Sequence, residues 1–391
     1  MHFLFVAMNG VAQGYLAFVL TGSAAALGVT AFTGTVPGIF FASLGGYVAD
    51  RWPRKYVLMW MQVFQLVTAL AMGTLIATGL IEFWHLLVYA VTQSFGMSMQ
   101  ISSRQAWIPS LVPREDMAQA IAINQAGQNL TRIIGPALAG MLIGIPWFGV
   151  EGLYYTRTVS CSLVLITFTM IPINGVPDTT RKRGNILQEM LFGYKYVFQH
   201  DALPSLFTYA LVVTILGLAY QALLPAFALG VFMVGAQGLG VMQTAVAGGA
   251  LAGSLSMAAV VSHRPDKAKL QAFAGALLGL SLVLFGVCAL TGLFLPALAT
   301  LAVVGFAVST NDVLNSTLVM LNSEQAVYGR VMSVYQVVQS FAPLSASIFG
   351  SAMDNVGGGP VMIGIGATVT LFVLAMSLLH PGYKRIRETI T

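Results

Sequence analysis

Residues 46–55 read Gly-Tyr-Val-Ala-Asp-Arg-Trp-Pro-Arg-Lys, a segment whose charges follow a long apolar run at 26–49 and precede another at 56–79. Charged residues are rare elsewhere, since they make up only 8% of the 391-residue chain. A soluble globular domain carries about 25%. A chain this poor in charge cannot cover a water-facing surface, so its apolar side chains must face lipid. The segment is therefore predicted to be a loop between two membrane-spanning helices.

Apolar runs recur along the whole chain at the length that crosses a bilayer, about 20 residues. With short loops they fill nearly the whole sequence and leave no room for a large soluble domain. The predicted fold class is an all-α polytopic membrane protein with twelve transmembrane helices in two six-helix halves. The predicted spans are 1–20, 26–49, 56–79, 83–103, 118–145, 152–173, 203–223, 234–261, 269–290, 293–318, 329–352 and 360–380.

Basic residues gather on alternate loops and on the C-terminal tail. Of the 18 Lys and Arg residues, only Arg132 and Arg157 fall elsewhere. Cytoplasmic loops of membrane proteins carry an excess of Lys and Arg. We therefore expect a multi-pass protein of a bacterial inner (cytoplasmic) membrane, with both termini in the cytoplasm.

A polar stretch divides the chain into a half at 1–173, a cytoplasmic linker at 174–202 and a second half at 203–391 with a short cytoplasmic tail. Apolar residues in the linker recur at helical spacing, which favours an amphipathic helix on the membrane surface. A solvated linker fits the same residues, and the two interpretations are compatible. Gly135-Pro136 in the fifth span and Ala342-Pro343 in the eleventh are corresponding interruptions, typical of transporters built from repeats.

The segment 46–55 resembles the signature loop between the second and third helices of the major facilitator superfamily. Pro53 stands where many members have a second glycine. A second segment resembles the fifth-helix signature of drug–proton antiporters in that superfamily and reads Gly135-Pro136-Ala137-Leu138-Ala139-Gly140. We refer to Gly135, Pro136 and Gly140 as the fifth-helix motif. The residues that fit the loop signature are Gly46, Val48, Ala49, Asp50, Arg51, Arg54 and Lys55.

Segments 20–23, 110–115, 129–136 and 329–333 are similar to the enterobactin-exporter-like and macrolide-efflux-like carriers, also called transmembrane secretion effectors. This resemblance implies a secondary active transporter that exports a small amphiphilic solute, such as a siderophore, antibiotic or drug, in exchange for protons. Members of that subgroup usually have a longer first helix, so we expect either an upstream start or a shortened member.

The resemblance also gives the charged loop a mechanical role. Gly46, Asp50, Arg51, Arg54 and Lys55 would form a conformational latch that steadies the outward-facing state. In this role Asp50 faces the N-terminus of the eleventh helix, near Gly329-Arg330. The same charges also fit an ordinary cytoplasmic loop, so the latch is one of two interpretations.

Arg132 is predicted near the middle of the fifth span, where a charge is costly and usually faces a cavity or a partner. Arg132 either belongs to a structural ion pair that orders the helices or contributes a charge to the substrate and proton pathway. The amides that would share a central site with it are Gln125, Asn129, Gln336 and Gln339.

Asp312 is the acid placed well inside a span of the second half. It lies either at the inner mouth of its helix or in the pathway as a proton carrier, because a carboxylate in a low-dielectric cavity can titrate during the cycle. Arg157 is expected to pair with Glu151. Gly248, Gly249 and Gly253 look like a close-packing face of the eighth span.

No catalytic constellation, metal-ligand spacing or nucleotide-binding loop stands out. We therefore expect no enzyme activity and no cofactor, with an ion gradient as the energy source. The expected partners of this monomer are a small-molecule substrate, protons and membrane lipid, but no nucleic acid. One alternative is a nutrient-uptake symporter of the same fold. A second alternative is a non-transporting membrane enzyme or sensor, which the lack of a catalytic constellation and of a soluble domain disfavours.

Overall fold

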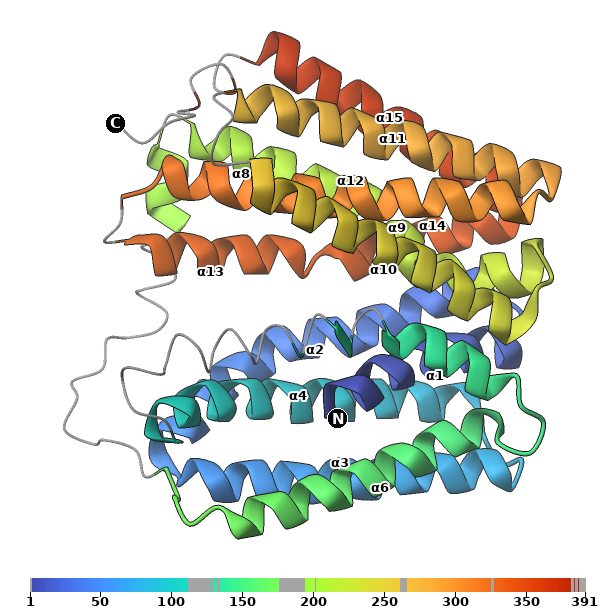
Figure 1. Ribbon diagram of the computed structural model, residues 1–391, viewed down its shortest axis with the longest axis vertical. Helices are drawn as coiled ribbons and strands as arrows, with labels where there is room; N and C mark the ends of the chain where they lie inside the picture. The colour runs from blue at the N-terminus through green and yellow to red at the C-terminus, as the bar shows by residue number, and fades with distance from the viewer. Residues whose placement is uncertain are drawn as a thin grey trace. The chain divides into compact units, whose positions relative to one another are not determined.

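Every regular element in the described part of the computed structural model is helical (Figure 1), which confirms the predicted all-α class. Hydrocarbon offers no water to backbone groups, and a helix pairs these groups within one segment. The structure describes residues 2–111, 127, 130–131, 134–175, 194–200, 202–260, 266–324, 327–380, 383 and 386.

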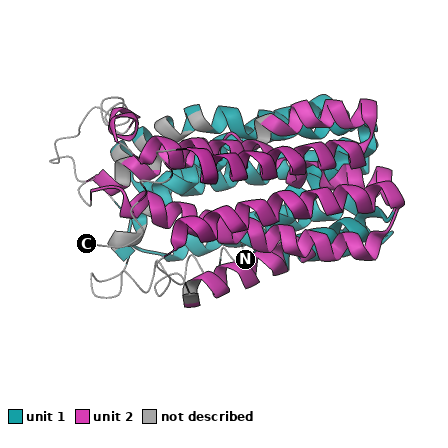
Figure 2. Cartoon of the chain, turned by 90° about the horizontal axis from the view of Figure 1, so that it is seen from above, with its two compact units in different colours: residues 1–182, 234–244 teal, residues 183–233, 245–391 magenta. Residues whose placement is uncertain are grey.

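The chain divides into two compact units, coloured in Figure 2. Unit 1 consists of residues 1–182 and 234–244, and unit 2 of residues 183–233 and 245–391. The start of α10 therefore belongs to unit 1. The amphipathic helix predicted in the linker falls largely on residues 176–193, which lie outside the described residues.

Unit 1 contains long helices that pack side by side, α2 against α4, and α3 against both α4 and α6. A short apolar helix, Ile134–Ile143, also belongs to this unit. The long helices are α1 (His2–Thr21), α2 (Ala24–Arg51), α3 (Arg54–Ala77), α4 (Phe83–Leu111) and α6 (Gly149–Met170).

Unit 2 is built around α11, which packs along α12 and α15. Its first helical stretch contains two π-helical segments, η2 and η3. The elements are α8 (Leu203–Val212), η2 (Val213–Gly217), α9 (Ala219–Ala226), η3 (Phe227–Val231), α10 (Gly235–Val260, shared with unit 1), α11 (Lys267–Thr291), α12 (Phe294–Leu321), α13 (Tyr328–Gln339), α14 (Ala342–Val356) and α15 (Gly358–Leu379).

Each of the twelve predicted spans coincides with helical residues, the fifth only over its described part. Seven helices in the described ranges are long and apolar enough to cross a membrane. Two helix ends differ most from the prediction: α4 continues to Leu111 instead of ending at 103, and the seventh span continues to Val231 instead of ending at 223. The interruption predicted at Pro343 is present, because α13 ends at Gln339 and Pro343 lies in the first turn of α14.

Two glycines of α10 allow a close crossing with α12 inside unit 2. A Cβ atom at Gly249 would lie 1.8 Å from the carbonyl oxygen of Ala302, and one at Gly253 would lie 2.6 Å from that of Phe306. Gly305 of α12 is similarly close to Val246, at 2.0 Å. Gly248 has no neighbour within 4 Å, so the predicted close-packing face includes Gly249 and Gly253 but not Gly248.

Replacing Gly249 with alanine is expected to lower the stability of unit 2, because the added methyl group collides with backbone rather than with a movable side chain. Overpacking of this kind costs about 1–3 kcal/mol. Thermal unfolding of the purified protein in detergent measures the effect. Gly248→Ala is the matched control, and equal melting temperatures for the two variants would contradict the close crossing.

Candidate transport site

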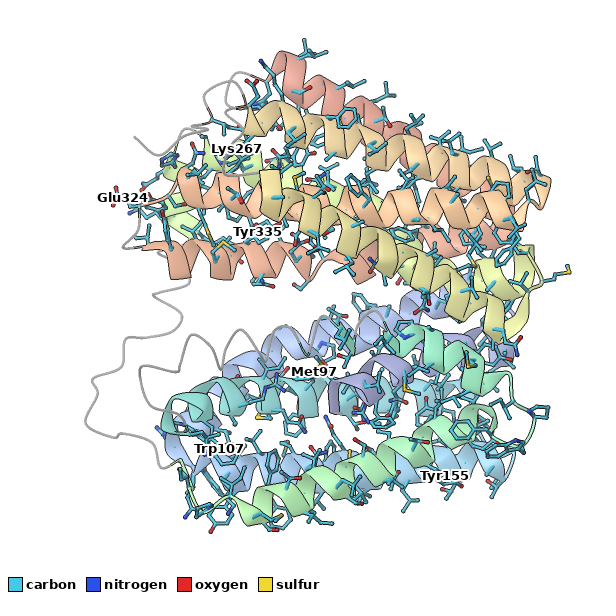
Figure 3. The ribbon with its side chains drawn as sticks, in the orientation of Figure 1. Met97, Trp107, Tyr155, Lys267, Glu324 and Tyr335 are labelled. Atoms are coloured by element: carbon cyan, nitrogen blue, oxygen red, sulfur yellow. The ribbon has the colours of Figure 1, made fainter. Side chains whose placement is uncertain are left out.

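The carboxylate of Asp312 is the centre of a polar cluster within unit 2. Its Oδ1 atom accepts hydrogen bonds from the hydroxyl of Tyr335, at 2.7 Å, and from Nε2 of Gln339, at 2.8 Å. The other end of the Gln339 amide accepts a hydrogen bond from Thr214 Oγ1, at 2.6 Å. Tyr335 is labelled in Figure 3. All of these partners are neutral, and no ion pair of Asp312 occurs among the described residues.

Local geometry explains why these four side chains meet. Asp312 lies inside the continuous helix α12 rather than at its end. Tyr335 and Gln339 are four residues apart on α13, so they share one face of that helix. Thr214 belongs to the π-helical segment η2, and such segments often occur at functional sites.

Asn311 and Asn315 belong to a second, buried network on another face of α12. Asn311 donates a hydrogen bond to the Tyr209 hydroxyl at 3.1 Å, and Asn315 accepts one from Gln271 at 2.6 Å. Tyr383 also donates to Gln271, at 2.8 Å. Asp312 is exposed whereas both asparagines are buried. An interaction between the side chains of Asn315 and Tyr335 connects this network to the Asp312 cluster.

The remaining predicted pathway residues are not brought together by described contacts. Gln336 is exposed on α13, one position away from the face that carries Tyr335 and Gln339. Arg132, Gln125 and Asn129 lie outside the described residues. Their place in a central site stays a prediction.

Three residues of the charged loop have described surroundings. Arg51 donates to the hydroxyl of Tyr47, and its guanidinium lies 4.1 Å from the centre of that ring. The backbone N–H groups of Arg54 and Lys55 donate to the carbonyl oxygens of residues 175 and 174. Nζ of Lys55 donates to the carbonyl oxygen of Ile171, at 2.6 Å. Gly46, Asp50 and Arg51 are helical residues of α2, and α3 begins at Arg54. The loop predicted over 46–55 is therefore shorter than expected and consists of residues 52–53.

Lys55 therefore binds the carboxyl end of α6, within unit 1. The last carbonyl groups of a helix lack intrahelical partners, and a cation placed there is favourable. The latch interpretation did not include this contact. It depends on the neighbouring packing of α3 and α6, which sequence spacing does not reveal.

The glycines of the fifth-helix motif mark close approaches inside unit 1. A Cβ atom at Gly135 would lie 2.7 Å from that of Ala7 on α1. One at Gly140 would lie 2.6 Å from Cα of Gly240, in the part of α10 that belongs to this unit. Pro136 follows Gly135 inside the helix Ile134–Ile143. The motif thus provides contact surfaces for two other helices.

Arg157 is a buried cation on α6, and only 3% of it is exposed. Its Nη2 atom donates to Oε1 of Gln65 on α3, at 3.2 Å, and to Oε1 of Gln93 on α4. The expected pairing with Glu151 is wrong, because the hydrogen bonds of the guanidinium go to these two amides. The sequence did mark Arg157 as a base outside the loops, but gave no sign of its partners.

The transmembrane secretion effector family matches residues 4–382. The enterobactin exporter EntS of Citrobacter koseri is 24% identical over 364 residues, covering 91% of this chain and 77% of the relative. Macrolide efflux protein A of Streptococcus pyogenes is 21% identical over 340 residues, covering 86% and 83%.

Solved transporter structures share the fold at low sequence identity. A mutant of the nucleoside transporter NupG superposes with a TM-score of 0.76 at 13% identity, covering 96% of this chain and 97% of that one. A D-xylose–proton symporter superposes with a TM-score of 0.69 at 14% identity, and 98% of each chain is covered. With the all-helical architecture and the match over residues 4–382, the chain belongs to the transmembrane secretion effector family of major facilitator superfamily transporters.

Proposed function

We propose that this transporter exports a small amphiphilic solute and exchanges it for protons. The observation that carries the proposal is the carboxylate of Asp312, which lies inside a membrane-length helix and has the neutral partners Tyr335 and Gln339. An acid placed in this way inside a membrane protein usually marks a substrate or ion pathway. Neutral hydrogen-bond donors orient such an acid without cancelling its charge.

Protonation of Asp312 would change the cluster in a definite way. The ionised carboxylate only accepts hydrogen bonds, whereas the protonated form can also donate one. The contacts from Tyr335 and Gln339, now both directed at one oxygen atom, would then be redistributed. Because Gln339 also accepts from Thr214 in η2, a proton on α12 would alter the bonding of α13 and η2 together.

Export is favoured over uptake by two observations. The relatives are named as an enterobactin exporter and a macrolide efflux protein, and the fifth-helix motif resembles that of drug–proton antiporters. The solute would be a siderophore, an antibiotic or another drug. A proton-coupled uptake symporter is the alternative, and it would show accumulation instead of extrusion in the same assay.

The remaining parts of the proposal come from the sequence pattern. The halves 1–173 and 203–391, joined by the linker 174–202, would expose a central site to each side of the membrane in turn. Arg132, Gln125, Asn129, Gln336 and Gln339 would contribute to that site. The protein would act as a monomer in a bacterial inner membrane, with both termini in the cytoplasm.

The variant Asp312→Asn is expected to lose proton-driven export while solute exchange continues. An amide cannot carry the proton, but it preserves the shape and most hydrogen bonds of the site. Cells that overexpress the protein are first tested against a panel of siderophores and drugs, with and without a protonophore. A compound that is exported is then followed in membrane vesicles, under an imposed pH gradient and by exchange without a gradient.

Asp354→Asn is the matched control, because Asp354 is an exposed acid near the end of α14 in the same unit. It should export at the wild-type rate. Gradient-driven export by Asp312→Asn at the wild-type rate would refute Asp312 as the proton carrier. Insensitivity of wild-type export to the protonophore would refute proton coupling itself.

The latch proposal predicts that Asp50→Asn leaves the protein in the membrane but slows transport. A charge near a helix terminus contributes about 0.3–1 kcal/mol, so we expect export about two- to fivefold slower. Initial export rates at matched amounts of membrane-inserted protein measure the effect. Asp266→Asn is the control, since Asp266 is an exposed loop acid paired with Lys269, and equal rates for both variants would leave the latch without support.

A further inference from the structure

Arg157 sits in a cluster that is built to hold a positive charge. Gln65 and Arg157 are 2% and 3% exposed, and the guanidinium donates to Gln65 and Gln93. Gly96 of α4 provides the space for the Gln65 side chain, because a Cβ atom there would lie 2.8 Å from Nε2 of Gln65. The cluster thus joins α3, α4 and α6 inside unit 1.

The charge of Arg157 is not neutralised by a carboxylate among the described residues, where the ion pair recorded is Lys269 with Asp266. Its Nε atom is buried and has no hydrogen-bond partner there, and neither has the hydroxyl of Tyr154, one turn earlier on α6. Buried polar atoms are nearly always paired. The cluster therefore combines one full positive charge with unused donors, which is the chemistry that receives an oxyanion.

The side chain of Gln93 covers the guanidinium of Arg157 on the side that is partly accessible. That side chain is half-buried, whereas Arg157 behind it is buried. The amide oxygen accepts from Arg157, so the NH2 end points away from the guanidinium. That end has only a long contact with Thr68 Oγ1, at 3.5 Å, which is at the limit of a hydrogen bond. A change of the Gln93 rotamer would uncover the guanidinium.

We propose that Arg157 and Gln93 form a recognition site for the anionic oxygen group, such as a carboxylate, of the transported solute. The guanidinium supplies charge-assisted hydrogen bonds, which are the strong ones, and Gln93 supplies a further donor at the accessible edge. The rings of Tyr89 and Tyr154, 5.4 Å apart in an edge-to-face pair, are buried in the same unit and help to exclude water from the guanidinium. The inference rests on the proposed export of an amphiphile and narrows the solute to an anionic one.

The decisive variant is Gln93→Glu. It has the same shape as wild type, but it puts a carboxylate where the amide oxygen contacts Arg157, so the internal ion pair occupies the charge. We expect the wild type to bind 1-naphthoate about tenfold more tightly than its neutral analogue 1-naphthamide. The variant should lose this preference while its melting temperature stays equal or rises. Equilibrium dialysis with purified full-length protein in detergent measures both dissociation constants.

Gln221→Glu is the matched control, because it makes the same change at an exposed position of α9 and should keep the preference. Arg157→Gln should lose it as well. If Arg157 only ties the helices together, Gln93→Glu will retain the wild-type preference, and the inference is overturned. A wild type without a preference for the carboxylate, including one that binds neither probe, also overturns it.

Failure of this inference can be told apart from failure of the proposed function. Export in the cell assay without a carboxylate preference in dialysis refutes the anion site and leaves proton-driven export standing. A carboxylate preference that Gln93→Glu removes, without any export in cells, supports the anion site and refutes the exporter.

Discussion

A peptide group in the hydrocarbon core of a bilayer has no water to bind, so the chain itself must provide every hydrogen-bond partner. Helices satisfy the backbone, and in the described part of the chain most Ser and Thr hydroxyl groups donate within their own helix. Thr30, Thr158 and Thr244 each donate to the carbonyl oxygen four residues earlier. Against this background, the hydroxyl groups of Thr214 and Tyr335 differ, because they donate to other elements around Asp312.

The same lack of water makes two charged residues within long helices important. Asp312 in unit 2 and Arg157 in unit 1 have opposite sign, and each is held by neutral amides or hydroxyls in the described part of its unit. A direct ion pair would cancel the charge and be difficult to break. Neutral partners fix the position of a charge and leave it able to bind a proton or an anion, which a transporter must do reversibly.

The fold was predictable because it depends on composition and on the length of apolar runs. The positions of helix ends were less predictable. Residues 221–240 are apolar without a clear break, so the helix end at Val231 does not appear as a change in hydropathy. Gly248 and Gly249 are adjacent in sequence, and only their neighbours distinguish them. One of them meets α12 and the other meets nothing within 4 Å.

The candidate site was predictable only in part, for a geometric reason. Asp312 and Gln339 were identified as polar residues in apolar spans, but their contact joins helices distant in sequence. Arg157 was assigned to Glu151, six residues away, although that separation turns the two side chains by roughly 240° around α6. Its actual partners, Gln65 and Gln93, lie on two other helices, and single-sequence periodicity does not say which helices are neighbours.

The charged loop makes structural contacts that are separate from the proposed latch. Lys55 binds the end of α6, and the backbone of Arg54 and Lys55 binds residues 174–175, where the chain leaves α6. Gly175 lies against Trp107 of α4 with φ of 63°, and a Cβ atom there would be 2.4 Å from the indole ring. These contacts all lie within unit 1. A latch contact made by Asp50 would exist in only some states, so the base at the end of the motif should govern stability and the acid should govern rate.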